Sequence, residues 1–107
     1  MRLADAAPVF AALGDPTRLK MFARLSVSGP LSIVRLTEGS DISRQAVTKH
    51  LRALEEVGLV SSGRVGRERV WELQPRRLSE VRYYLDVISG QWDTALDRLR
   101  TLVETGE

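Results

Sequence analysis

The chain has 107 residues, of which 43% are apolar and 28% charged. This length predicts one domain over residues 1–107 with a modest core, and the apolar share excludes a wholly disordered chain. The absence of cysteine excludes disulfides, thiolate metal sites and cysteine nucleophiles. No apolar run approaches about 18 residues, and the N-terminus lacks an apolar signal core, so we expect a cytoplasmic protein without membrane contact.

The net charge is only +2, but the charges are unevenly distributed. Residues 61–77 contain five arginines and two glutamates, whereas residues 78–107 contain three basic and six acidic side chains. Basic surfaces favour polyanions. The middle of the chain is therefore a candidate nucleic-acid contact, with an ordinary solvated surface as the alternative.

The first predicted helix covers about residues 3–13, where apolar side chains recur at helical spacing. Pro8 lies inside this stretch, so the helix either starts there or bends. The residues that share its apolar stripe are Ala6, Val9, Phe10 and Leu13.

A second helix is predicted from Pro16 to about residue 27. Gly14 suits the end of the preceding helix, Asp15 is a good N-cap, and Pro16 fits a first turn. Its expected buried face consists of Leu19, Phe22, Ala23 and Leu25. A short helix is expected next, at about residues 31–37, followed by a polar turn at 38–41.

The next helix, at about residues 43–56, buries a stripe formed by Val47, Leu51 and Leu54. Two helices joined by a short polar turn indicate a helix-turn-helix. The second helix of this motif enters the DNA major groove, with its N-terminal residues near the base edges. We therefore name residues 43–56 the reading helix.

The buried stripe turns a set of polar side chains outward on the reading helix. Arg44 can pair with guanine and Gln45 with adenine, while the others suit phosphate oxygens, which set the register but not the sequence. An amphipathic helix with a merely solvated polar face is the alternative. The predicted DNA contacts on this helix are Ser43, Arg44, Gln45, Thr48, Lys49 and Arg52.

A β-hairpin is predicted over about residues 59–73, because two β-prone runs flank a glycine-containing linker. Its tip is rich in arginine. Arg64, Arg67 and Arg69 could contact the DNA backbone or an adjacent minor groove. For one of them, an exposed ion pair with Glu68 is the alternative.

The last predicted helix, at about residues 78–104, carries apolar residues at alternating spacings of four and three, which is a heptad seam. Packing on the chain's own core is one explanation. A domain this small has too few other helices to cover the seam, so we expect a homodimer paired through the last and first helices. The predicted interface residues are Val9, Leu85, Ile88, Trp92, Leu96, Leu99 and Leu102.

Together these stretches resemble the ArsR/SmtB family of winged helix-turn-helix repressors. The similarity covers almost the whole chain in order, through residues 12–19, 29–33, 43–60 and 66–73. It implies a mainly α fold with a two-stranded β-hairpin wing, in the order α-α-α-α-β-β-α. It also implies a homodimer that represses transcription by binding a pseudo-palindromic operator.

The family's metal sites are absent from this sequence. Its thiolate sensors carry a Glu-Leu-Cys-Val-Cys-Asp motif before the turn, where this chain has Ser32 and Val34 in place of the cysteines. The last helix contains no histidine, and a solvated acidic face is a better explanation than a metal site for Asp86, Asp93, Asp97 and Glu104. We therefore expect no metal and no cofactor.

The sequence predicts a homodimeric, sequence-specific regulator that binds double-stranded DNA, with a winged-helix protein-interaction module as the alternative. An unknown small-molecule inducer could bind between the subunits near Tyr83, Tyr84 and Trp92, although interface packing also explains these aromatics. We expect no enzyme, because the chain has no cysteine, a single histidine inside a helix and no glycine-rich phosphate loop. His50 also lies about 10 Å along the helix from Ser43, too far to activate it.

Overall fold

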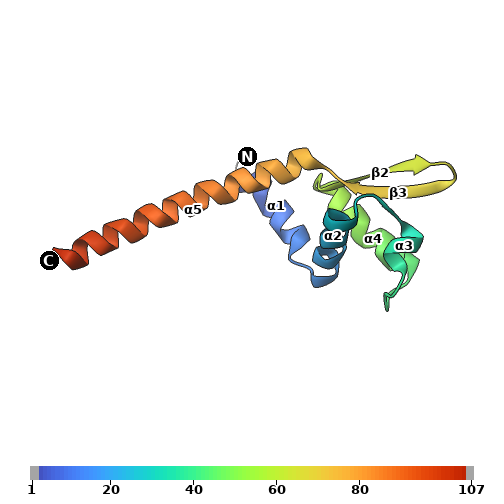
Figure 1. Cartoon of the computed structure of the whole chain (residues 1–107), viewed down its shortest axis with the longest axis horizontal. Helices are drawn as coiled ribbons and strands as arrows, with labels where there is room; N and C mark the ends of the chain where they lie inside the picture. Colours follow the sequence, from blue (N-terminus) through green and yellow to red (C-terminus); the bar gives the residue numbers. More distant parts are fainter. Residues whose placement is uncertain (1–2, 106–107) are drawn as a thin grey trace.

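The computed structural model describes residues 3–105. Figure 1 shows a group of helices formed by residues 3–56, which we call the head, with a β-hairpin on one side and a long helix that projects in the opposite direction. In chain order the elements are α1 (Leu3–Leu13), α2 (Pro16–Ser28), β1 (Leu31–Ser32), α3 (Ile33–Thr37), α4 (Arg44–Glu56), β2 (Val60–Val65), β3 (Glu68–Leu73) and α5 (Pro75–Glu104).

The start of helix α2 follows the prediction. The Asp15 carboxylate accepts the backbone N–H of Arg18 at 3.0 Å, and Pro16 occupies the first turn. The helix ends at Gly29, whose φ of 78° belongs to the left-handed region that glycine adopts readily. Helix α1 does not start at Pro8, which is one of the two predicted alternatives, but runs through it from Leu3 to Leu13.

The Asp15 cap makes stability depend on pH. The Arg18 N–H bond, helped by the charges of Arg18 and His50, lowers the pKa of Asp15 below its ordinary value of 3.8. A lowered pKa in the folded state stabilises the fold above pH 3.8, and this contribution is lost as the pH falls through the lowered pKa. The unfolding free energies of wild type and Asp15→Ala should therefore differ at pH 7, and the difference should shrink as the pH falls below 3.8, as measured by urea titration. A constant difference would contradict the role of the charge.

The core lies between the helices and the base of the hairpin. Val47, Leu51 and Leu54 of α4 are fully buried, as predicted, and pack with Leu25 and Trp71. The indole N–H of Trp71 has no hydrogen-bond partner among residues 3–105. This tryptophan is the largest fully buried side chain of the core.

The predicted buried face of α2 is partly wrong. Met21 and Leu25, one turn apart, form the buried face, whereas Leu19 is half exposed and Ala23 exposed. Phe22 is partly buried against the same core. Leu19 and Ala23 each lie two residues from Met21, which places them about 200° around the helix from it.

The sheet has three strands, in the order β1-β3-β2, and not the two that the sequence predicts. Leu31 and Ser32, expected in a helix, form β1 and pair with Trp71 and Val70 of β3. Ser32 is the N-cap of α3, with φ −77° and ψ 165°. An N-cap residue takes extended geometry, which allows this short segment to pair with the free edge of β3.

The wing, β2 and β3 with their turn, is an antiparallel hairpin with six residue pairs, from Val60 opposite Leu73 to Val65 opposite Glu68. A two-residue turn connects the strands, and Gly66 has a φ of 64° there. Two-residue hairpin turns require a positive φ at their first position, which glycine adopts without strain.

Helix α5 projects away from the head (Figure 1). It begins at Pro75, three residues before the expected start, because proline fits the first helical turn. Val81 is buried, but every residue from Leu85 to Thr105 is exposed. The radius of gyration is 18.8 Å and the longest dimension 68 Å, against a radius of about 13 Å for a compact chain of this length. Within residues 3–105, no helix is both long and apolar enough to span a bilayer.

Candidate nucleic-acid interface

The first residues of the reading helix, α4, are exposed to solvent. Ser43 is its N-cap, and the hydroxyl oxygen accepts the backbone N–H of Ala46 at 3.2 Å. The N-terminal end of a helix carries a partial positive charge and free N–H groups, which favour anions such as phosphate. Ser43 therefore defines the start of the surface predicted to contact DNA.

The outward face of α4 carries the side chains that the sequence predicts. Gln45, Lys49 and Arg52 follow one another at helical spacing opposite the buried stripe and are exposed, and Arg44 is exposed beside them. Thr48 lies on the flank, half buried, and its hydroxyl donates to the Arg44 carbonyl at 2.9 Å. That proton is thus already used inside the helix.

Within the described part of the chain, the cations of this face and of the wing form no ion pairs with acidic side chains. Among residues 3–105, no ion pair includes the arginines and lysine proposed to contact DNA. The possible pair between Glu68 and a wing arginine is not formed. These cations are Arg44, Lys49, Arg52, Arg64, Arg67 and Arg69, and all six are exposed.

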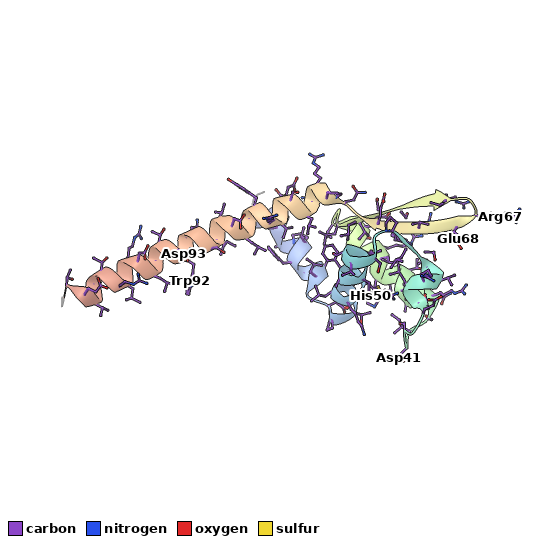
Figure 2. The ribbon with its side chains drawn as sticks, viewed as in Figure 1. Asp41, His50, Arg67, Glu68, Trp92 and Asp93 are labelled. Carbon is purple, nitrogen blue, oxygen red and sulfur yellow. The ribbon has the colours of Figure 1, made fainter. Side chains whose placement is uncertain are left out.

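The wing projects beyond the helical head, and Arg67 lies in its turn (Figures 1 and 2). Arg64 in β2 and Arg69 in β3 are direct cross-strand partners. The wing and α4 thus provide two exposed basic surfaces. One lies on an α-helix, which fits the DNA major groove, and the other on a projecting hairpin.

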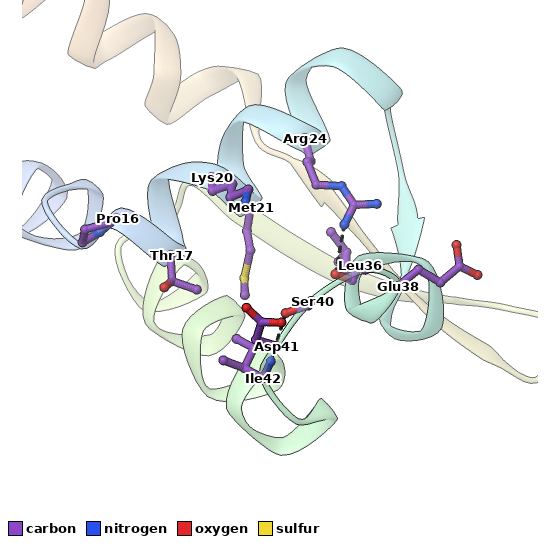
Figure 3. A pocket seen from close by; sticks show the side chains of 11 residues that line it. Pro16, Thr17, Lys20, Met21, Arg24, Leu36, Glu38, Ser40, Asp41 and Ile42 are labelled. Carbon is purple, nitrogen blue, oxygen red and sulfur yellow. Dashed lines mark hydrogen bonds between the residues drawn. The ribbon is translucent and has the colours of Figure 1, made fainter.

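Arg24 supports this region in a way that the sequence does not signal. Its guanidinium donates to the carbonyls of Leu36 and Arg35, both at 3.0 Å, and so joins α2 to the end of α3. It also lines an open cavity of about 490 Å³ beside the α3–α4 turn (Figure 3). Lys20, Glu38 and Asp41 line the same cavity, whose mixed charges favour neither anions nor cations.

Known proteins share this arrangement. A helix-turn-helix domain family matches residues 13–62. The HTH-type transcriptional regulator Rv2034 of Mycobacterium tuberculosis is 35% identical over 88% of this chain and 84% of its own length. A solved ArsR-like transcriptional regulator from Rhodococcus sp. RHA1 is 36% identical, covers 92% of each chain and gives a TM-score of 0.79. The chain belongs to the ArsR family of winged helix-turn-helix transcription regulators.

Membership in the ArsR family makes this chain a DNA-binding transcription regulator and not an enzyme, as the sequence predicts. A more distant likeness, 20% identical with a TM-score of 0.66, agrees in fold alone. It is a solution structure of a homodimeric winged helix-turn-helix DNA-binding domain from Mycobacterium bovis, matched over 83% of this chain and 82% of that one.

One kind of metal site in the ArsR family uses cysteine thiolates, and this chain cannot form it. It has no cysteine. Within residues 3–105, no three histidine or carboxylate side chains gather closely enough to hold a metal ion. The acidic residues of α5 are exposed along the projecting helix. The residues present therefore do not fit the family's thiolate site, and we assign no metal chemistry to it.

The structure separates the predicted interface residues of this ArsR-family chain into two groups. Val9 is only 1% exposed and packs in the chain's own core, so it offers no surface to a second copy. This part of the prediction is corrected. The six residues of α5 are 41–66% exposed in a single chain: Leu85, Ile88, Trp92, Leu96, Leu99 and Leu102.

The aromatic residues suggested to line an inducer pocket do not converge in one chain. Tyr84 packs against Phe10, with ring centroids 6.1 Å apart at 45°. Tyr83 and Trp92 are both about two-thirds exposed. An inducer pocket between two subunits stays a prediction.

Proposed function

We propose that this ArsR-family chain forms a homodimeric, sequence-specific repressor that binds a pseudo-palindromic operator in double-stranded DNA. The unpaired cationic face of α4 carries this proposal. Arg44, Lys49 and Arg52 are exposed opposite the buried stripe, and no carboxylate among residues 3–105 neutralises them by an ion pair. A cationic helical face of this size suits the major groove.

The roles of the site residues follow from their positions. Arg44 and Gln45 lie in the first turn of α4, where side chains of a reading helix meet base edges, and their groups match guanine and adenine. Ser43, Lys49 and Arg52 contact phosphates. Thr48 contacts a phosphate only when its hydroxyl proton leaves the Arg44 carbonyl, because a phosphate oxygen accepts hydrogen bonds and does not donate them. The wing arginines contact the backbone or minor groove beside the major-groove site.

The exposed seam of α5 supports the homodimer. A single chain leaves large apolar side chains along this helix in water, and exposed apolar surfaces of this extent mark interaction sites. The solved domain from Mycobacterium bovis, which shares the fold, is described as homodimeric. A two-fold dimer presents two reading helices to two half-sites, which explains a pseudo-palindromic operator.

Side-chain size favours an antiparallel pairing of the two α5 helices. A parallel pair would place Trp92 against Trp92 and Ala95 against Ala95, which crowds one layer and leaves the next one empty. An antiparallel pair centred between residues 93 and 94 places each Trp92 against Ala95 of the partner subunit. The same register gives two further layers, namely Leu85 with Leu102 and Ile88 with Leu99.

Selection of genomic fragments tests the function. Purified protein is incubated with fragmented genomic DNA, and the retained fragments are sequenced. We expect an inverted-repeat motif, with affinity that falls steeply as salt rises, because phosphate contacts release counterions. The protein-interaction module would instead give no enriched motif and no salt-dependent retention on heparin.

Repression is tested separately from binding. A reporter gene is placed behind a selected fragment, with and without this chain expressed in the same cells. We expect lower reporter expression when the chain is present, and higher expression would identify an activator.

A further inference from the structure

The two faces of the wing differ in charge. Side chains alternate between faces along a strand, and directly opposed residues share a face. The inner face carries Val60 and Trp71, which join the same core as α4, and continues at the tip with Arg64 and Arg69. The outer face carries the exposed acids Glu68 and Glu72.

Arg64 and Arg69 are an unusual pair, because like charges directly opposed across a hairpin destabilise it. The β-carbons of such partners lie about 4.5–5.5 Å apart. No carboxylate within residues 3–105 forms an ion pair with either arginine, whereas the half-exposed Arg77 pairs with Glu80 at 2.9 Å. The tip thus concentrates two positive charges on one small surface without compensation.

We propose that Arg64 and Arg69 form a two-arginine clamp that holds a single backbone phosphate of the DNA duplex. This inference rests on the proposed function and adds the face of the wing that meets DNA. Two guanidinium groups that start from opposed positions can both donate to one phosphate, which accepts several charge-assisted hydrogen bonds. The duplex then lies on the inner side, towards the reading helix, because Glu68 and Glu72 repel phosphates from the outer side.

The clamp differs from the alternative in which each arginine contacts its own phosphate. Each neutralised phosphate contributes about 0.9 to the slope of log affinity against log salt. Removal of both arginines therefore lowers the slope by about one unit per wing if they share a phosphate. The slope falls by about two units per wing if they do not.

A phosphate-replacement experiment tests the clamp. The probe is a fluorescein-labelled 30-base-pair duplex from the selected fragments, in which single phosphates are replaced by neutral methylphosphonates. We expect wild type to lose affinity when one particular phosphate per half-site is replaced. The same phosphate should become less sensitive to replacement in Arg64→Gln and in Arg69→Gln, and insensitive in the double variant. Each single variant should weaken binding roughly tenfold, and the double variant further, because it alone leaves that phosphate without a guanidinium.

Two substitutions serve as controls. Arg76→Gln removes the same charge from α5, where the side chain is 93% exposed, and should leave the position map unchanged. The double change Glu68→Gln and Glu72→Gln alters the outer face and should also keep the map. The clamp is wrong if the two single variants change the sensitivity of two different phosphates, or of none.

Stability of the free protein gives a readout without DNA. Because the opposed charges repel, Arg64→Gln and Arg69→Gln should each raise the thermal midpoint by roughly 1–5 °C at low salt. The increase should vanish at 1 M salt, where charges are screened. If wild type binds no selected duplex, the proposed function fails, and the clamp with it. If wild type binds and the two variants bind equally well, only the clamp fails.

Discussion

Replacement of Leu99 by aspartate should convert the protein from dimer to monomer. Leu99 is 58% exposed in a single chain, so the head can fold with a charge there. In the antiparallel pair the same position faces Ile88 of the partner subunit, where an unpaired buried charge costs about 3–5 kcal/mol. We expect the dimer dissociation constant to rise at least about a hundredfold, as measured by sedimentation equilibrium.

Operator binding should fall with the dimer, because a monomer holds only one half-site. Thr94→Asp is the matched control, since Thr94 is exposed on the same helix but points away from the seam. It should dimerise and bind DNA as wild type does. Circular dichroism should show the same helix content for both variants at high concentration. An intact dimer of Leu99→Asp would show that the seam does not form the interface.

Replacement of Arg44 by alanine should weaken specific binding and blur selectivity at one base pair. Loss of a bidentate contact to guanine costs about 1–3 kcal/mol per half-site, and the homodimer carries two. Fluorescence anisotropy with the selected duplex should show the loss, whereas a scrambled duplex should show little change. Arg44 is exposed, so its replacement leaves the packing of the core unchanged.

Lys49→Ala separates base reading from charge. Lys49 is exposed on the same face. If it contacts a phosphate, its removal should weaken binding to both duplexes equally and reduce the salt slope by about one unit per half-site. If Arg44→Ala shows this uniform pattern, Arg44 contacts a phosphate, and the base reading belongs to other side chains.

The features that sequence predicts well are those encoded by neighbours on one helix. Val47, Leu51 and Leu54 repeat every three or four residues, so their burial and the outward direction of Lys49 and Arg52 follow from helix geometry. Capping is equally local, because a side chain reaches only the next turn. The hairpin is equally predictable from local signals, because two β-prone runs flank a glycine-containing linker. The resemblance to the ArsR family then identifies this hairpin as the wing.

The errors arise where distant segments decide the outcome. Met21 and not Leu19 is buried because α2 packs beside α4 and β3 with one rotation among several that its apolar residues allow. Val9 belongs to the head because the fold closes α1 over the core. The hydrogen bonds from Arg24 to the end of α3 join residues that are 11 and 12 positions apart in the sequence. The spacing of apolar residues within one helix cannot predict such contacts between two helices.

The two tryptophans give separate optical signals for folding and for association. Trp71 is fully buried and Trp92 is 66% exposed in a single chain. The two indoles therefore have surroundings of different polarity, and their emission maxima lie at different wavelengths. Quenching by iodide should report Trp92 in the monomer and decrease as the helices pair, while Trp71 responds only when the core opens. In a Trp92→Phe variant, Trp71 is the remaining tryptophan, and its fluorescence follows unfolding alone. The difference between the wild-type and variant fluorescence is the Trp92 signal, which follows subunit exchange.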